Sequence, residues 1–332
     1  MNKLPEWFEV TSLLVIGGVL LADLLIIGRR PHVPSFSESA KWVGAYVAAA
    51  LVFAGLVLRV GGPHPAPQFV AGWLTEYPTS LDTQRVSTLC AGSFAVPRVL
   101  QQRTLMIGII IALVLRAGLI LVGASIIEKF SWVFYIFGVI LLITALKMLG
   151  GNEEEDYKEN LFMRTVRRIV PVSPDFEGTR LRVHRDGTWM VTPMLLVILA
   201  LGTTDLLFAF DSIPAIFGLT SDPFIVFTTN LFALMGLSEL YSMLGGLMER
   251  LVYLNYGLAA VLAFIGVKLV FEALHQNSLP FLNSGQPFEW APEIPIWASL
   301  LMIVASLGVA AVASLLWPPR SSADEVASTS SD

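Results

Sequence analysis

The chain has 332 residues, of which 55% are hydrophobic and only 14% charged, and its mean hydropathy is +0.70. Soluble domains carry about 25% charged residues, so this composition excludes an ordinary soluble protein. The net charge of −5 says little about partners, because acids in apolar segments and in the C-terminal tail contribute to it. We expect no nucleic-acid partner.

Nine long, predominantly apolar segments follow one another along the chain. They are residues 9–28, 42–60, 68–96, 104–123, 130–149, 191–217, 223–248, 254–273 and 294–316. A helix needs roughly 20 such residues to span a bilayer. The sequence therefore predicts an all-α polytopic membrane protein with about nine transmembrane helices, and its first partner is the lipid bilayer.

The distribution of basic residues predicts the orientation of these spans. Lys and Arg follow the first, third, fifth, seventh and ninth spans, whereas the connections at 61–67, 214–222 and 274–292 contain neither and the one at 124–129 has only Lys129. Cytoplasmic connections are enriched in Lys and Arg. We therefore expect the N-terminus outside and the C-terminus in the cytoplasm. The chain starts without the charged n-region and cleavage site of a signal peptide, so we expect the first span to remain as an anchor.

These elements divide the chain into six predicted parts. They are a two-span segment at 1–67, a three-helix repeat at 68–149, a cytoplasmic loop at 150–190, a second three-helix repeat at 191–273, an outer loop with the ninth span at 274–316, and a disordered cytoplasmic tail at 317–332. Within the loop, residues 181–184 are predicted to be one strand of a small hairpin that closes at Asp186-Gly187.

The two predicted repeats, spans three to five and spans six to eight, resemble each other. Their third helices end alike, with Ala145-Leu146-Lys147-Met148 in the first and Gly266-Val267-Lys268-Leu269 in the second. Because each repeat has three helices, the second enters the membrane from the opposite side. Such inverted repeats are typical of secondary transporters that hold their substrate near the middle of the membrane.

A short polar motif occurs once in each repeat. The first copy is Thr75-Glu76, five residues, Asp82-Thr83, and the second is Thr204-Asp205, five residues, Asp211-Ser212. Carboxylates are expensive in hydrocarbon, so an acid within a span indicates a functional site by default. Residues six apart on a straight helix point about 120° away from each other. Both acids of a copy can therefore meet one ion only if the helix is broken, and Pro78 and Pro214 are placed for such breaks.

Carboxylates, hydroxyls and freed carbonyls together form a hard oxygen site that suits Mg²⁺, Ca²⁺ or Mn²⁺. We predict a divalent cation site at the interface of the repeats, with the ligands Glu76, Asp82, Asp205 and Asp211. The supporting or path-lining residues are predicted to be Thr83, Thr204, Ser212, Asn230 and Asp23. The alternative is that the acids pair with Lys or Arg of neighbouring helices and serve only structure.

Basic residues inside the predicted spans leave this alternative open. Arg85 lies one turn after Asp82, where opposite charges pair. It is either a regulatory ion pair that competes with a bound cation or a side chain that extends to the cytoplasmic surface. We expect Arg59, Arg116 and Lys268 to extend outward or to pair structurally rather than to touch substrate.

The second motif copy resembles a known family. Residues 203–215 read TTDLLFAFDSIPA and residues 220–230 read TSDPFIVFTTN, a pattern similar to that of TerC-family integral membrane proteins. The resemblance runs from about the first predicted span to the eighth. It implies a bacterial inner-membrane protein of the tellurium-resistance family, several of whose members export manganese with the intramembrane acids as ligands. Some relatives are associated with membrane-protein insertion or with metal supply to exported enzymes.

The chain departs from the family pattern at three places. The first copy has Thr83 where an amide is usual and gains Pro78, Gly202 replaces an acid, and Ser238-Glu239 replaces an arginine.

The sequence contains no nucleophile elbow, phosphate-binding glycine loop or metalloprotease signature. We therefore expect no enzyme activity and no tightly bound cofactor. The leading prediction is a divalent metal cation transporter, with Mn²⁺ export across the plasma membrane by alternating access. The alternative is a non-transporting membrane scaffold or stress-response partner, associated with tellurite resistance or with metal supply to exported proteins.

Overall fold

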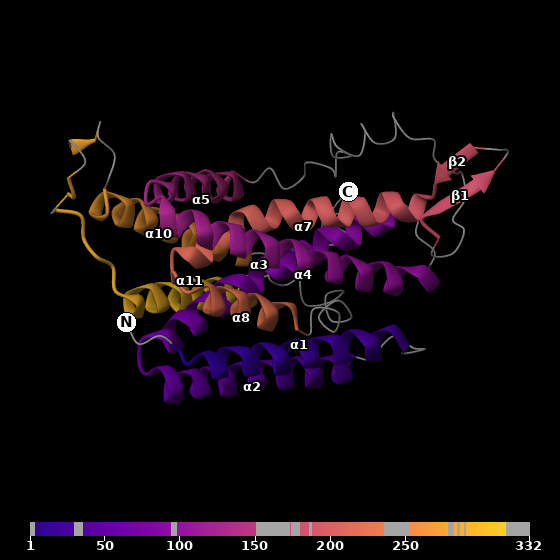
Figure 1. The fold of residues 1–332 in the computed structure, drawn as a ribbon, viewed down its shortest axis with the longest axis horizontal. Coiled ribbons are helices and arrows are strands. Elements are labelled where there is room, and N and C mark those ends of the chain that lie inside the picture. The colour runs from indigo at the N-terminus through magenta and orange to yellow at the C-terminus, as the bar shows by residue number, and fades with distance from the viewer. Residues whose placement is uncertain are drawn as a thin grey trace, which may run out of the picture.

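A computed structural model describes residues 4–29, 36–93, 98–150, 173, 180–185, 188–235, 253–277, 282–283, 286–288 and 290–316. Within these residues the chain forms nine helices and one two-stranded sheet (Figure 1). The helices are α1 (Glu6–Arg29), α2 (Phe36–Gly61), α3 (Pro65–Ser93), α4 (Arg98–Lys129), α5 (Val133–Leu149), α7 (Pro193–Phe217), α8 (Pro223–Leu234), α10 (Leu254–His275) and α11 (Ile296–Leu316). Each predicted span overlaps one of them. Residues 236–248 of the seventh predicted span lie outside the described residues, as do most of the loop at 150–190 and the tail at 317–332.

The composition of the described helices identifies a polytopic membrane protein. Five of them are long and apolar enough to cross a bilayer by themselves, namely Ser37–Gly61, Ile110–Lys129, Pro193–Phe217, Leu254–His275 and Ile296–Leu316. Val133–Leu149 and Pro223–Leu234 are shorter apolar helices. Large hydrophobic side chains such as Leu14, Leu146 and Val309 are exposed on the outer helix faces. Soluble monomers do not expose so much contiguous apolar surface, whereas lipid accepts it.

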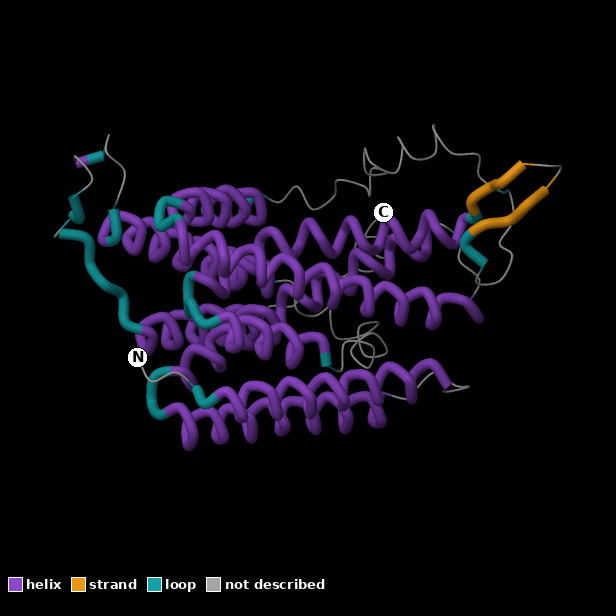
Figure 2. The backbone as a smooth tube through the Cα atoms, in the orientation of Figure 1, coloured by secondary structure: helices purple, strands orange, loops and turns teal. Residues whose placement is uncertain are grey.

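The helices run roughly along one direction, and almost all described residues are helical (Figure 2). α3 and α4 each contact both α7 and α8, while α5 packs along α10. An aromatic cluster joins α2 to this centre, with the Phe53 ring 4.9 Å from Phe69 of α3 and 5.0 Å from Phe232 of α8. Aromatic pairs at such distances add stability beyond the area that they bury. The helices α3 and α8 therefore pack against α2 as well as against the other central helices.

The predicted helix breaks at Pro78 and Pro214 are not present. α3 runs through Pro78 and α7 runs through Pro214 without interruption. Proline is tolerated inside a membrane helix because neighbouring helices and Ser or Thr hydroxyls satisfy nearby backbone groups. The Thr79 hydroxyl donates to the carbonyl of Thr75, 3.2 Å away, in the turn around Pro78. Asp205 and Asp211 therefore stay on different faces of a continuous helix.

The two strands of the predicted hairpin are confirmed, while its predicted turn at Asp186-Gly187 lies outside the described residues. β1 (Arg182–Arg185) pairs antiparallel with β2 (Thr188–Val191), and Arg185 is opposite Thr188. The hairpin joins α7 through a single residue, Thr192, whose hydroxyl donates to the carbonyl of Arg180, 2.6 Å away. Its backbone N–H also donates to the carbonyl of Leu181. The hairpin is thus fastened directly to the start of α7, beyond the end of the helix bundle (Figure 1).

α5 and α10 approach each other closely at two glycines. A Cβ at Gly138 would lie 2.8 Å from the carbonyl oxygen of Gly266, and a Cβ at Gly266 would lie 3.0 Å from that of Gly138. Small residues at helix interfaces allow such backbone contact in membranes. The contact is reciprocal, since each glycine makes room for the backbone of the other.

We expect Gly138→Ala to lower the free energy of unfolding by about 1–3 kcal/mol, because the added methyl overpacks a backbone contact. Thermal unfolding of the purified protein in detergent measures the effect. Gly118→Ala is the matched control, since a Cβ at Gly118 of α4 meets nothing within 4 Å. Equal destabilisation by the two substitutions would contradict the prediction.

Candidate functional site

A buried arginine lies at the centre of the bundle. Arg116 of α4 is 1% exposed, and its Nη1 donates to Oε1 of Glu76 and to Oδ1 of Asn230, the latter 2.9 Å away. Its Nη2 donates to Oδ1 of Asp205, 3.1 Å away. Glu76 is 0% and Asp205 5% exposed. α3, α4, α7 and α8 thus each contribute one residue to what we call the Arg116 cluster: Glu76, Arg116, Asp205 and Asn230.

Local features of α8 position Asn230 for this contact. Asp222 caps the helix by accepting a hydrogen bond from the backbone N–H of Phe224, 2.9 Å away, and Pro223 occupies the first helical position. Both features favour a helix start at this point. Asn230 then uses its amide group to donate to the carbonyl of Val226, 3.2 Å away. This donation leaves its oxygen directed at Arg116.

Two buried oxygens of the cluster have no hydrogen-bond partner among the described residues. They are Oε2 of Glu76 and Oδ2 of Asp205. The buried hydroxyls of Ser80 and Ser212, outside the cluster but on the same two helices, also have no hydrogen-bond partner there, although Ser212 is close enough to Glu76 to interact with it. Leaving a buried acceptor without a partner costs about 1–3 kcal/mol, and more when it is charged. With both acids ionised, two carboxylates surround one guanidinium, so the described cluster carries a formal charge of −1. Hard oxygens with negative charge suit a cation.

The structure places Asp211 elsewhere. The Thr144 hydroxyl of α5 donates to Oδ1 of Asp211, 2.9 Å away, and Lys147 of the same helix interacts with it electrostatically. Asp211 is half-buried. Because α7 is unbroken, Asp205 and Asp211 point in different directions, and only Asp205 reaches Arg116. Among the described residues, no group of three or more His, Cys, Asp and Glu side chains is arranged to hold a metal ion.

The remaining residues that were predicted to belong to the site differ in how close they lie to the Arg116 cluster. Thr204 and Ser212 are buried on α7, close along the chain to Asp205. Asp23 of α1 accepts a hydrogen bond from the Tyr46 hydroxyl of α2, away from the Arg116 cluster. The helix at 81–93 is described, but the side chains of Asp82, Thr83 and Arg85 are outside the described part.

The central position of Arg116 was not predicted from the sequence. Arg116 was expected to pair structurally or to extend outward, and the structure confirms pairing. The available signal was the position of Arg116 near the middle of an apolar helix, too far from either end to reach the membrane surface. Ionisable residues at such positions almost always face the bundle interior and pair there.

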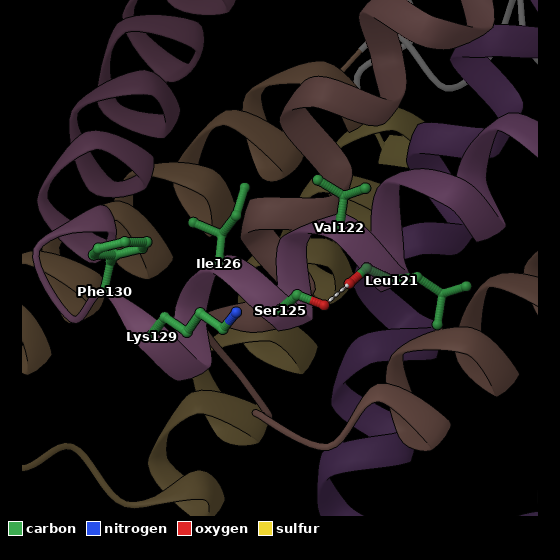
Figure 3. A pocket seen from close by; sticks show the side chains of 6 residues that line it. All are labelled: Leu121, Val122, Ser125, Ile126, Lys129 and Phe130. Carbon is green, nitrogen blue, oxygen red and sulfur yellow. Dashed lines mark hydrogen bonds between the residues drawn. The ribbon is translucent and has the colours of Figure 1, made fainter.

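A shallow hollow on α4 is unrelated to this cluster (Figure 3). It is lined by Leu121, Val122, Ser125, Ile126, Lys129 and Phe130, which belong to the last turns of α4 and the residue after it. Leu121 and Val122 are largely exposed, and Ser125 donates to the carbonyl of Leu121, 2.8 Å away. The hollow therefore faces lipid and offers a cation only the like charge of Lys129.

Comparison with known proteins identifies the family. Residues 61–322 match the family model described as "Integral membrane protein TerC family". The chain belongs to the TerC family. The match includes every residue of the Arg116 cluster, but it begins at the end of α2 and continues through α11. The match thus begins later than the first predicted span and extends beyond the eighth, through the ninth.

Several relatives of this TerC protein are bacterial membrane proteins. An uncharacterized membrane protein of Mycobacterium bovis is 41% identical over 314 residues, which cover 93% of this chain and 79% of that protein. One from Myxococcus xanthus is 38% identical over 310 residues, covering 92% of each. The Escherichia coli protein named "Putative membrane-bound redox modulator Alx" is 37% identical over 266 residues, covering 77% of this chain and 83% of that protein. No solved structure matches the chain.

Proposed function

We propose that this TerC protein transports a divalent cation, with Mn²⁺ favoured, out of a bacterial cell across the plasma membrane. The observation that carries the proposal is the Arg116 cluster. It brings one carboxylate from α3 and one from α7 into the buried centre of the bundle, and each has one oxygen that makes no hydrogen bond within the described residues. The excess of negative charge favours a cation over an anion, and hard oxygen donors favour Mn²⁺, Mg²⁺ or Ca²⁺ over soft metals. The family resemblance favours Mn²⁺ among these.

The helix contacts support two inverted repeats. If α3, α4 and α5 correspond to α7, α8 and α10, the contact of α3 with α8 has its counterpart in that of α4 with α7. Gly138 and Gly266 then form a reciprocal contact between corresponding helices, and Glu76 corresponds to Asp205. Transporters built in this way hold substrate between the halves and expose it to each side in turn.

We extend this proposal to the whole chain. Nine spans place the N-terminus outside and the C-terminus in the cytoplasm, with the repeats at 68–149 and 191–273 separated by the cytoplasmic loop. Glu76 and Asp205 are the central ligands, assisted by oxygens of Ser80, Ser212 and Asn230. Asp82 and Asp211 bind the ion on its way in or out, which agrees with the half-buried position of Asp211.

Expression of the protein in a manganese-sensitive bacterium is expected to lower cell manganese and to relieve manganese toxicity. Glu76→Gln is expected to abolish both effects, because it removes one central ligand charge. Metal content measured by mass spectrometry tests this. Glu293→Gln is the matched control, since its exposed carboxylate pairs with His275 in the connection before α11. Unchanged manganese in cells that express the wild type would contradict the proposal.

A second candidate function is a non-transporting scaffold or stress-response partner. It is favoured by the pairing of both central carboxylates with Arg116, which holds three helices to α4 without any ion. The name of the relative Alx refers to redox modulation, a role that needs no transport. On this reading Glu76→Gln would lower stability but leave cell manganese unchanged.

A further inference from the structure

The guanidinium of Arg116 occupies the place between the two central carboxylates. It binds one oxygen of Glu76 and one of Asp205, and the second oxygen of each has no partner in the described part of the chain. The Nε of Arg116 also has no partner. The guanidinium is thus held only through its two outer nitrogens, at the end of a long side chain.

We propose that Arg116 is a tethered competitor of the transported cation. Its guanidinium fills the position between Glu76 and Asp205 when no cation is bound, and it leaves that position when a cation enters. The inference rests on the proposed function and adds a residue that sets the affinity of the site. The residue that competes with the ion is then Arg116 of α4, in the role that the sequence suggested for Arg85.

The charges make the two occupants mutually exclusive. Two carboxylates and the guanidinium sum to −1, whereas two carboxylates and a divalent cation sum to 0. Keeping both the guanidinium and the divalent cation between the acids would give +1 and would place like charges side by side in a buried site, where repulsion is strong. Binding of the cation therefore requires Arg116 to withdraw.

The geometry of the guanidinium couples this exchange to the helices. Its planar fork reaches acceptors on α3, α7 and α8 at once, which a lysine ammonium does not reproduce with the same geometry. When Arg116 withdraws, α4 loses its polar contacts to α7 and α8 together. When no cation is bound, Arg116 thus holds α4 of the first repeat against α7 and α8 of the second. Cation binding breaks these contacts.

Mn²⁺ binding to the purified full-length protein, measured by calorimetry with manganese chloride, tests this inference. Arg116→Gln is expected to bind Mn²⁺ at least tenfold more tightly than the wild type, and Arg116→Lys to lie between them. Arg59→Gln is the matched control, because it removes an exposed arginine from α2. It is expected to bind like the wild type.

Thermal unfolding with chelator and with Mn²⁺ provides a second readout. Arg116→Gln is expected to unfold at a lower temperature than the wild type in chelator and to regain more stability from Mn²⁺. If Arg116→Gln folds only when purified with Mn²⁺, that supports the inference. If it folds under neither condition and Arg116→Lys binds Mn²⁺ like the wild type, the inference is overturned.

The outcomes separate this inference from the proposed function. If the wild type binds Mn²⁺ and Arg116→Gln binds it equally or less tightly, the inference alone fails. If neither the wild type nor the two Arg116 variants bind Mn²⁺, the proposed function fails and the inference with it.

Discussion

Replacement of Arg116 by leucine is expected to destabilise the cation-free protein by about 3–5 kcal/mol. The buried ion pairs give the reason, because removing one partner leaves uncompensated charge in a low-dielectric interior. Glu76 and Asp205 are almost fully buried and would have no counter-charge among the described side chains around them. Thermal or denaturant unfolding in detergent with chelator present measures the loss.

A second variant separates charge compensation from packing. Replacing Glu76, Arg116 and Asp205 together by apolar residues of similar volume is expected to recover most of the lost stability, since buried ion pairs are often dispensable as a set. Arg59→Leu on the exposed face of α2 is the control for loss of a single arginine. A stable Arg116→Leu protein in chelator would show that the acids are not ionised together in the cation-free state.

Loss of a central carboxylate is expected to reduce Mn²⁺ transport by at least about 100-fold. Even groups that only support metal ligands change affinity by 10–100-fold, and Glu76 and Asp205 are proposed to touch the ion directly. Asp211→Asn, in contrast, is expected to reduce the transport rate by about tenfold or less and to leave Mn²⁺ affinity unchanged. The difference follows from its separate contact with Thr144, outside the Arg116 cluster.

Mn²⁺ flux into proteoliposomes, followed with an entrapped fluorescent indicator, measures these effects in purified protein. Glu76→Gln, Asp205→Asn and Asp211→Asn are isosteric, so they change charge with little change in shape. If Asp211→Asn abolishes Mn²⁺ binding as Glu76→Gln does, the ion site includes Asp211 and α7 must open between Asp205 and Asp211 during transport.

The sequence was sufficient for the helices and for part of the site. Long apolar stretches predicted where the helices lie, and the duplicated motif predicted that Glu76 and Asp205 are related. Both features are local in the chain, since they depend on composition and spacing. The hairpin could also be predicted because Asp186-Gly187 is a typical turn between two short strands.

The partners of these residues could not be predicted in the same way. The position of Arg116 in an apolar helix indicates that it faces the bundle interior, but it cannot show which residues of α3, α7 and α8 become its partners, because tertiary packing decides this. The same holds for Asp23, which finds Tyr46 rather than the ion path. Pro78 and Pro214 were expected to break their helices, but the surrounding helices keep α3 and α7 continuous.

The attachment of the hairpin to α7 has a mechanical consequence. Asp205 lies halfway along α7, and the hairpin ends at Val191, separated from Pro193 by the single residue Thr192. At 1.5 Å per residue, the hairpin is about 18 Å from Asp205 along the helix axis. If α7 tilts about its middle, Asp205 moves little, whereas the hairpin at the end of the helix is displaced much further. Trp189, which is 68% exposed on that hairpin, is therefore well placed for an optical probe of motions too small to see at the site itself.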